Sequence, residues 1–369
     1  MENPVLMKQL QARQIPALFP KQDIPAGAAA VKSARPLWLK ALAAGEYGQM
    51  PGAPVGFEIR ETKRVRDAFH GKAIHTWYRL TCTTPGGRFS FPFQLVLPEG
   101  TDPVPVFLQI SFFGVLPNPS CPVDDIVDRG FGICSFQYTD VVPDTTDGLD
   151  EGLAGRFDAS NRASDGTGAI GYWAWAAQRI ADFLQVHPRV KADHIAVIGH
   201  SRLGKTALWA GATDERFSFT VSIQSGCSGA AITRGKNGER VANISQMFPH
   251  WFCPDYARFA DREAEMPFEQ HQLLAAIAPR LLYVSSAQED TWADPPSEFL
   301  GCVAASEAWT AAGEPGFITG DAMPVCGAVH HEGRIGYLLR AGGHALEPQD
   351  WKQVMDFWAM RLKDVSPLP

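Results

Sequence analysis

The pattern of apolar and polar residues differs between the first hundred residues and the rest of the chain. Apolar and polar residues alternate in three stretches, at 55–60, 76–83 and 89–98, and a Pro-Gly-Gly turn separates the last two. Such alternation, bounded by turn residues, is typical of half-buried antiparallel strands. We therefore expect antiparallel strands to lead the sheet.

From residue 104 onward, short apolar runs replace this alternation and helical segments follow some of them. A helical spacing of apolar residues spans 168–186 and another spans 349–362. The β–α–β order through residues 104–210 predicts a mainly parallel sheet with helices on both faces. The runs that we interpret as strands lie at 104–111, 130–137, 195–198, 217–224, 277–287 and 336–340.

The sharpest local signal is the stretch 195–210, where a strand turns through Gly199-His-Ser-Arg into a helix. A strand that reverses at Gly-x-Ser and leads into a helix is typical of the nucleophile elbow of α/β hydrolases. Here Leu203 occupies the usual position of the second glycine, and Gly204 follows it. The plain alternative is a tight turn with an ordinary serine. The predicted fold class is α/β, an α/β-hydrolase three-layer sandwich with a mostly parallel central sheet.

Length and composition fit one large catalytic domain. The chain has 369 residues, of which 45% are hydrophobic and 20% charged. We expect an N-terminal extension at 1–50 packed on the core and a single catalytic domain at 51–369. Residues 140–155 carry several acids, which favours a solvated loop.

The same composition argues against several partners. The net charge is −7 and no lysine/arginine run occurs, so a nucleic-acid partner is not expected. The sequence has no run of eighteen consecutive apolar residues, so a membrane-spanning helix is not expected. The seven cysteines form no C-x-x-C pair, so a zinc knuckle is not expected. We expect a monomer.

Acyl transfer by a serine needs a histidine as base and an acid that orients the histidine. In this fold the three residues follow one another along the chain in the order serine, acid, histidine. Ser201 is the candidate nucleophile, and His344 is the candidate base because it follows the last strand on a Gly-Gly turn. The strand after the elbow helix ends at Gln224, which cannot carry a negative charge. The next strand exit offers Glu289 and Asp290, and we choose Asp290.

Two cations, Arg202 and Lys205, follow the serine on the first turn of its helix. They suit a substrate with hydroxyl groups or a developing oxyanion, although a solvated surface pair is the plain alternative. The Phe-Phe-Gly loop after the 104–111 strand is a second possible source of an oxyanion-hole N–H.

The stretch Gly199-His-Ser-Arg-Leu-Gly-Lys205 resembles the elbow of the glucuronoyl esterases, carbohydrate esterase family 15, which reads Gly-Cys-Ser-Arg-x-Gly-Lys. The resemblance is to the bacterial branch and extends over about residues 90–362. It includes the motifs at 225–231, 248–253, 273–280 and 289–295. It implies hydrolysis of the ester between 4-O-methyl-glucuronic acid on glucuronoxylan and lignin alcohols, without a metal or other cofactor.

Position by position, the resemblance implies that Ser201 is the nucleophile, that His344 is the base and that Arg202 helps to hold the oxyanion. It also implies that three residues contact the hydroxyls and ring of the uronate: Lys205, Glu239 and Trp292. Lys and Glu can hydrogen-bond vicinal hydroxyls, and an indole offers a flat apolar face. The plain alternatives are a surface role for Glu239 and a core role for Trp292.

The chain departs from the family pattern at three positions. His200 replaces the cysteine before the serine, and Ala345 follows the histidine, so the disulfide that fungal members form there is excluded. Gln224 stands at the usual acidic position, whereas Asp290 matches the acid that some bacterial members use. The N-terminus lacks a signal-peptide pattern. We expect a secreted or periplasmic enzyme whose leader is absent from this sequence, with a cytoplasmic location as the alternative.

Other functions stay open from the sequence. An acetyl ester hydrolase on polysaccharide would use the same serine and histidine, but it gives no role to Lys205 and Glu239. A carbohydrate-binding relative with weakened catalysis is a further alternative, which Gln224 favours slightly.

Overall fold

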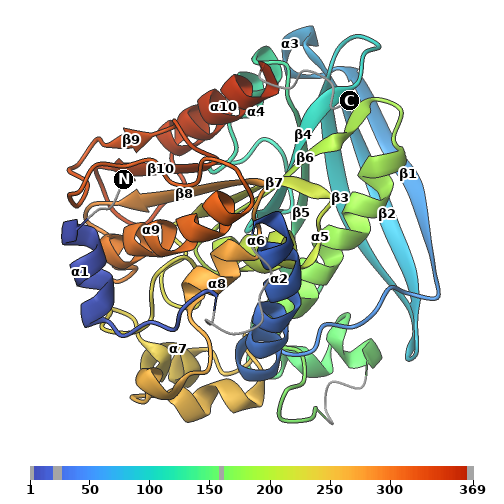
Figure 1. Cartoon of the computed structure of the whole chain (residues 1–369). Helices are drawn as coiled ribbons and strands as arrows, with labels where there is room; N and C mark the ends of the chain where they lie inside the picture. The colour runs from blue at the N-terminus through green and yellow to red at the C-terminus, as the bar shows by residue number, and fades with distance from the viewer. Residues whose placement is uncertain (1–3, 20–26, 158–161, 364–369) are drawn as a thin grey trace.

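The computed structural model describes residues 4–19, 27–157 and 162–363. Within these residues one ten-stranded sheet runs in the order β1-β2-β3-β5-β4-β6-β7-β8-β10-β9, as Figure 1 shows. The strands are β1 Gly56–Asp67, β2 Ala73–Thr84, β3 Gly87–Pro98, β4 Val104–Ser111, β5 Gly132–Gln137, β6 Val190–His200, β7 Phe217–Ile223, β8 Leu281–Ala287, β9 Val329–His330 and β10 Ile335–Arg340.

Strands β1, β2 and β3 pair antiparallel, and β5 joins β3 antiparallel. Strands β5, β4, β6, β7, β8 and β10 are parallel, and β9 closes the edge antiparallel to β10. The predicted mostly parallel sheet and its antiparallel leading strands are therefore confirmed, as is the α/β-hydrolase fold class. In such sheets the carboxyl ends of the parallel strands form the edge where sites are built.

Helices cover both faces of this sheet (Figure 1). On β4 the side chain of Phe107 packs into one core and that of Leu108 into the other, as alternation along a strand requires. Helices α4 and α10 cover the first face; α2, α5, α6, α8 and α9 cover the second. The helices are α1 Pro4–Ala12, α2 Ala28–Leu42, α3 Ala68–Gly71, α4 Val123–Asp128, α5 Ala169–Val186, α6 Arg202–Thr213, α7 Val241–Met247, α8 Gln270–Ala275, α9 Pro295–Ala311 and α10 Pro348–Lys363.

The N-terminal helices contribute to the second core. Leu6 and Leu10 of α1 and Val31 and Trp38 of α2 are buried in it. A π-helix at Ala43–Tyr47 then leads toward β1. Among the described helices, none is long and apolar enough to cross a membrane.

The expectation of a solvated loop at 140–155 holds for most of its acids but not for the whole segment: Asp140, Asp147, Asp150 and Glu151 are exposed. Val142 and Leu153 of this segment are fully buried, and the indole of Trp173 on α5 donates a hydrogen bond to the carbonyl of Val142 at 3.0 Å. The apolar residues between the acids pack beneath α5, while most of the acids stay at the surface. Asp144 is the exception: its side chain is 8% exposed and lies next to the elbow, as described below.

Candidate active site

The elbow at the end of β6 has the strained geometry that exposes a nucleophile. Ser201 has φ 60° and ψ −126°, and its N–H donates to the carbonyl of Ile223 at 2.9 Å. A Cβ at Gly199 would lie 2.0 Å from the carbonyl oxygen of Leu203, so only glycine fits there. Gly204 also lies close to the end of β7, because a Cβ there would be 3.1 Å from the carbonyl oxygen of Ile223. The shifted second glycine therefore still serves the close approach of helix and sheet.

The N-terminus of α6 offers backbone donors next to the serine. The N–H groups of Gly204 and Lys205 bond to the carbonyl of Ser201. A helix leaves its first N–H groups without intrahelical acceptors, which here are those of Arg202 and Leu203. A helix N-terminus also favours negative charge. The backbone N–H of Arg202 thus lies directly after Ser201 without an intrahelical acceptor.

His344 and Asp290 form a direct hydrogen bond. Nδ1 of His344 lies 2.6 Å from Oδ2 of Asp290, and the other carboxylate oxygen accepts the Ala293 N–H at 3.2 Å. Burial would raise the pKa of Asp290, but the hydrogen bond and charge of His344 hold it below its ordinary value. Glu289 is exposed, and its N–H bonds to Gly342 O at 3.0 Å. Of the two candidate acids, Asp290 is the one in contact with the histidine.

A tilted contact between two imidazole rings brings His344 to the elbow. Its ring centroid lies 4.5 Å from that of His200, the residue before Ser201. Within the described chain, the Ser201 hydroxyl makes no hydrogen bond to His344. Catalytic hydrogen bonds are often long in unliganded enzymes and tighten when substrate binds. His344 also lines an open surface depression with Gly342, which leaves it accessible.

Gln224 occupies the position of the missing acid but has a different contact set. Its side-chain carbonyl oxygen accepts hydrogen bonds from Nε2 of His200 at 3.2 Å and from the Ala345 N–H at 2.9 Å. Burial and the nearby His344 lower the pKa of His200 to about 3, so that ring stays neutral. Gln224 therefore links the elbow to the histidine loop without carrying charge.

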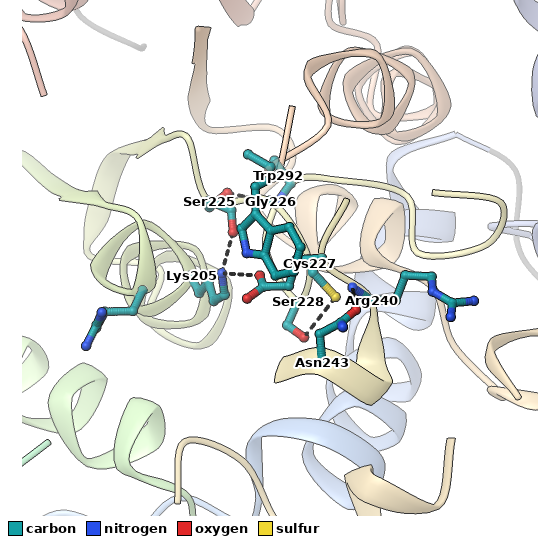
Figure 2. A network of polar contacts seen from close by, with 12 residues as sticks. Lys205, Ser225, Gly226, Cys227, Ser228, Arg240, Asn243 and Trp292 are labelled. Atoms are coloured by element: carbon teal, nitrogen blue, oxygen red, sulfur yellow. Dashed lines mark hydrogen bonds and ion pairs between the residues drawn. The ribbon is translucent and has the colours of Figure 1, made fainter. Parts of the chain in front are cut away.

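The three predicted sugar-contact residues lie together. Nζ of Lys205 donates to the carbonyl of Ser225 at 2.6 Å and lies 3.8 Å from Oε2 of Glu239. The Glu239 N–H in turn bonds to the carbonyl of Trp292 at 2.9 Å. Figure 2 shows Lys205, Ser225 and Trp292 in this network. Lys205 and Glu239 are buried, whereas Trp292 is 49% exposed, so none of the three matches its plain alternative.

Sequence reasoning did not find Lys236, which fixes the same loops. Its Nζ donates to the carbonyls of Asn237 and Trp292 at 2.7 and 3.0 Å. Gly238 has φ +65°, and a Cβ there would lie 2.5 Å from the carbonyl of Trp292. The loop that carries Glu239 is thus closely packed against the loop that carries Trp292.

Asp144 is a second residue that sequence reasoning did not find. Its carboxylate accepts hydrogen bonds from His250 at 2.8 Å, Trp251 at 2.6 Å and Tyr138 at 2.9 Å, and it pairs with the guanidinium of Arg202. His250 and Trp251 come from the 248–253 motif, which was the available signal. Burial acts to raise the pKa of Asp144, but these donors hold it well below its ordinary value.

The aromatic residues around Arg202 complete its environment. Its guanidinium carbon lies 4.6 Å from the ring centroid of Trp251 and 5.7 Å from that of Phe112, which belongs to the loop after β4. An arginine held by a carboxylate and by aromatic rings has a fixed orientation. In the described residues, no group of three or more metal-ligating side chains is arranged to hold an ion. All seven cysteines lie in described segments and are free.

Comparison with known proteins identifies the family of this chain. A family model described as "Glucuronyl esterase, fungi" matches residues 80–313, which is more than half of the chain. The chain belongs to the glucuronoyl esterase family. It is 35% identical over 350 residues to carbohydrate esterase MZ0003 from an unknown prokaryotic organism, covering 84% of this chain and 80% of that protein.

More distant relatives and solved structures agree. A 4-O-methyl-glucuronoyl methylesterase from Hypocrea jecorina is 30% identical over 279 residues, or 73% of this chain, and the chain spans 55% of its length. A glucuronoyl esterase from Solibacter usitatus has a TM-score of 0.86 and 32% identity, covering 93% of this chain and 96% of that one. A glucuronoyl esterase from Teredinibacter turnerae has a TM-score of 0.88 and 29% identity, covering 95% of this chain and 90% of that one. By family, this chain is a carboxylic ester hydrolase.

Proposed function

We propose that this chain hydrolyses esters of glucuronic or 4-O-methyl-glucuronic acid, as in lignin–glucuronoxylan linkages. The observation that carries the proposal is the pairing of Lys205 with Glu239 next to the exposed indole of Trp292. A cation and a carboxylate can share the vicinal hydroxyls of a sugar, and the indole can cover its apolar face. The name of the fungal relative, 4-O-methyl-glucuronoyl methylesterase, agrees with such a substrate.

The proposed reaction is acyl transfer through Ser201. His344 takes the proton of the Ser201 hydroxyl as the oxygen attacks the ester carbonyl, and Asp290 stabilises the imidazolium that results. The backbone N–H of Arg202 donates to the oxyanion, and its guanidinium adds positive charge. His344 then gives its proton to the departing alcohol, and water releases the uronate from the serine.

The compartment follows from this substrate. A polymer of the plant cell wall lies outside the cell that degrades it, so we place the reaction in a secreted or periplasmic compartment.

The test is alcohol release from benzyl glucuronate by the wild-type enzyme and by Ser201→Ala. We expect the variant to lose at least about 10³-fold in kcat, because the nucleophile is absent. Normal folding of the variant is checked by circular dichroism. Substantial turnover by folded Ser201→Ala would contradict the serine mechanism.

Acetyl ester hydrolysis is a second candidate function. One structural neighbour, 28% identical with a TM-score of 0.83, is titled a promiscuous CE15 esterase from a marine bacterial metagenome. A comparison of acetylated xylan with methyl glucuronate separates the two activities, since an acetyl group gives no contact to Lys205 or Glu239. A fluorophosphonate probe that fails to label the folded protein would favour a binding relative without catalysis.

A further inference from the structure

One buried arginine lies directly beneath the loop that carries His344. Arg340 is the last residue of β10 and is 3% exposed. Its guanidinium donates to three backbone carbonyls of the loop: those of Ala341 at 2.7 Å, Gly343 at 3.1 Å and Ala345. These carbonyls flank His344 on both sides, so a single side chain binds the loop from below.

A buried carboxylate holds this arginine in turn. Oδ2 of Asp350 accepts hydrogen bonds from Nε of Arg340 at 3.0 Å and from the Glu347 N–H at 2.8 Å. Oδ1 accepts a hydrogen bond from the hydroxyl of Ser285. Asp350 lies in the first turn of α10 and is fully buried. The pair therefore connects β10, α10 and, through Ser285, the neighbouring strand β8.

Apart from Arg340, few contacts of the described residues fix the shape of the loop. Gly342 has φ +88°, and nothing lies within 4 Å of a Cβ built on Gly343. Glycines leave a backbone free to move unless other contacts restrain it. His344 is 44% exposed, and in the described chain its only side-chain hydrogen bond is the one to Asp290. Two further hydrogen bonds restrain the loop: the Ala345 N–H donates to Gln224, and the Glu289 N–H donates to the carbonyl of Gly342 at 3.0 Å.

We propose that Arg340, held by Asp350, is a positioning residue for the base. It fixes the carbonyls on either side of His344 so that Nδ1 meets Asp290 and Nε2 faces Ser201. This inference rests on the proposed Ser201–His344 chemistry. A guanidinium suits the role because its planar fork of five N–H donors can reach separate carbonyls and a carboxylate together. The ammonium of a lysine is a single point with three donors and cannot span them.

The test is Arg340→Lys, which keeps the charge and removes the fork. We expect kcat on benzyl glucuronate and the rate of fluorophosphonate labelling of Ser201 each to fall about 10²-fold, the effect of a displacement of about 1 Å in a catalytic group. KM should change less than about twofold, because Lys205 and Glu239 are untouched. The far-downfield proton resonance of the His344 Nδ1–H should broaden or vanish.

The matched control is Arg280→Lys. Arg280 also donates to backbone carbonyls, those of Asp214 at 3.0 Å and Phe217 at 2.9 Å. It precedes β8, however, and so lies at the amino-terminal end of the parallel strands, away from the loop of His344. Its variant should lose a similar part of its thermal stability and keep the wild-type labelling rate and resonance. A drop of equal size in both variants would mean a general structural effect and would overturn the inference.

Asp350→Asn keeps the test decisive if Arg340→Lys does not fold. This isosteric change removes the counter-charge of Arg340, and labelling should fall about tenfold by the same displacement argument. A folded Arg340→Lys or Asp350→Asn protein with wild-type labelling would overturn the inference. Wild-type protein that labels at Ser201 but releases no alcohol from glucuronate esters would overturn the proposed substrate alone.

Discussion

Nδ1 of His344 lies 2.6 Å from Oδ2 of Asp290, and their two loops follow paired parallel strands. The last residues of β8 and β10 are direct neighbours in the sheet, and the Gln288 N–H bonds to the carbonyl of Arg340 at 2.8 Å. Gln224 follows β7, one strand away. The carboxylate that contacts His344 therefore follows β8 and not β7, and the histidine reaches it because β8 lies next to β10.

Asp290→Asn should lower kcat on benzyl glucuronate by about 10⁴-fold, as loss of the triad charge does in the serine-protease case. The amide cannot stabilise an imidazolium and can present an N–H to Nδ1. Steady-state kinetics measures the effect.

The comparison variants for Asp290→Asn are Glu289→Gln and Gln224→Ala. Glu289 is exposed and makes no side-chain contact with His344 among the described residues, so its variant should keep near wild-type activity. Gln224→Ala loses two hydrogen bonds to neutral groups and should cost at most about tenfold. If Gln224→Ala were the more damaging change, Asp290 would not be the acid.

Glu239→Gln should reduce kcat/KM for glucuronate esters about 10- to 100-fold, since hydrogen bonds to a charged group contribute about 1.5–3 kcal/mol. The same variant should hydrolyse 4-nitrophenyl acetate within about threefold of wild type, because this ester has no sugar hydroxyls. Asp261→Asn, which breaks an exposed pair with Arg240, is the control. Equal losses on both esters would show that Glu239 supports the fold and does not contact the sugar.

Asp144→Asn should destabilise the protein by about 3–5 kcal/mol at pH 7, because it leaves Arg202 without its buried partner. The pKa of Asp144 lies below its ordinary 3.8 in the folded state, so its contribution is complete above that pH and is lost as pH falls through the folded pKa. The difference between wild type and variant should therefore shrink below about pH 3.8. Chemical denaturation at pH 7 and pH 3 measures it, and a constant difference would contradict the assignment.

The main elements, the elbow and the contact between His344 and Asp290 were predictable from sequence because each depends on local signals. The run at 195–210 contains strand, turn and helix within sixteen residues, and the Gly-Gly turn before His344 follows an apolar run. Gln224 is excluded as the acid because it carries no charge, and Asp290 comes from the next strand exit. The order of serine, acid and histidine along the chain then indicates His344 as the base.

The supporting residues were not predictable, because their roles depend on contacts between distant segments. Asp144 is one acid among several, and only the burial of its apolar neighbours beneath α5 brings it to Arg202. Arg340 and Asp350 are ten residues apart and look like ordinary surface charges, yet both are buried. Hydrophobic periodicity does not report such pairs, because it describes faces of single elements and not the contacts of polar groups between them.

Glu46 provides the last prediction, because it is a fully buried acid on the π-helix. One carboxylate oxygen accepts Nε2 of Gln270 at 2.8 Å, and the other has no partner within the described residues. Burial raises the pKa of Glu46 to about 8; Gln270, Ser228 and Lys205 partly oppose this rise, and the charge of Glu269 adds to it. The folded protein therefore keeps this proton at pH values where the unfolded chain, with a pKa near 4.5, has released it.

The sign of the effect follows from that difference. Below about pH 4.5 Glu46 is protonated in both the folded and the unfolded chain, and its contribution to the free energy of unfolding is complete. As pH rises from there to about 8, the free energy of unfolding falls by up to about 1.4 kcal/mol per pH unit. Glu46→Gln cannot ionise, so its stability relative to wild type should increase steadily between pH 5 and pH 8. Urea denaturation at both pH values measures this change, with Glu58→Gln on the exposed face of β1 as control. A difference between wild type and Glu46→Gln that is the same at both pH values would mean that Glu46 is ionised in the folded protein throughout this range.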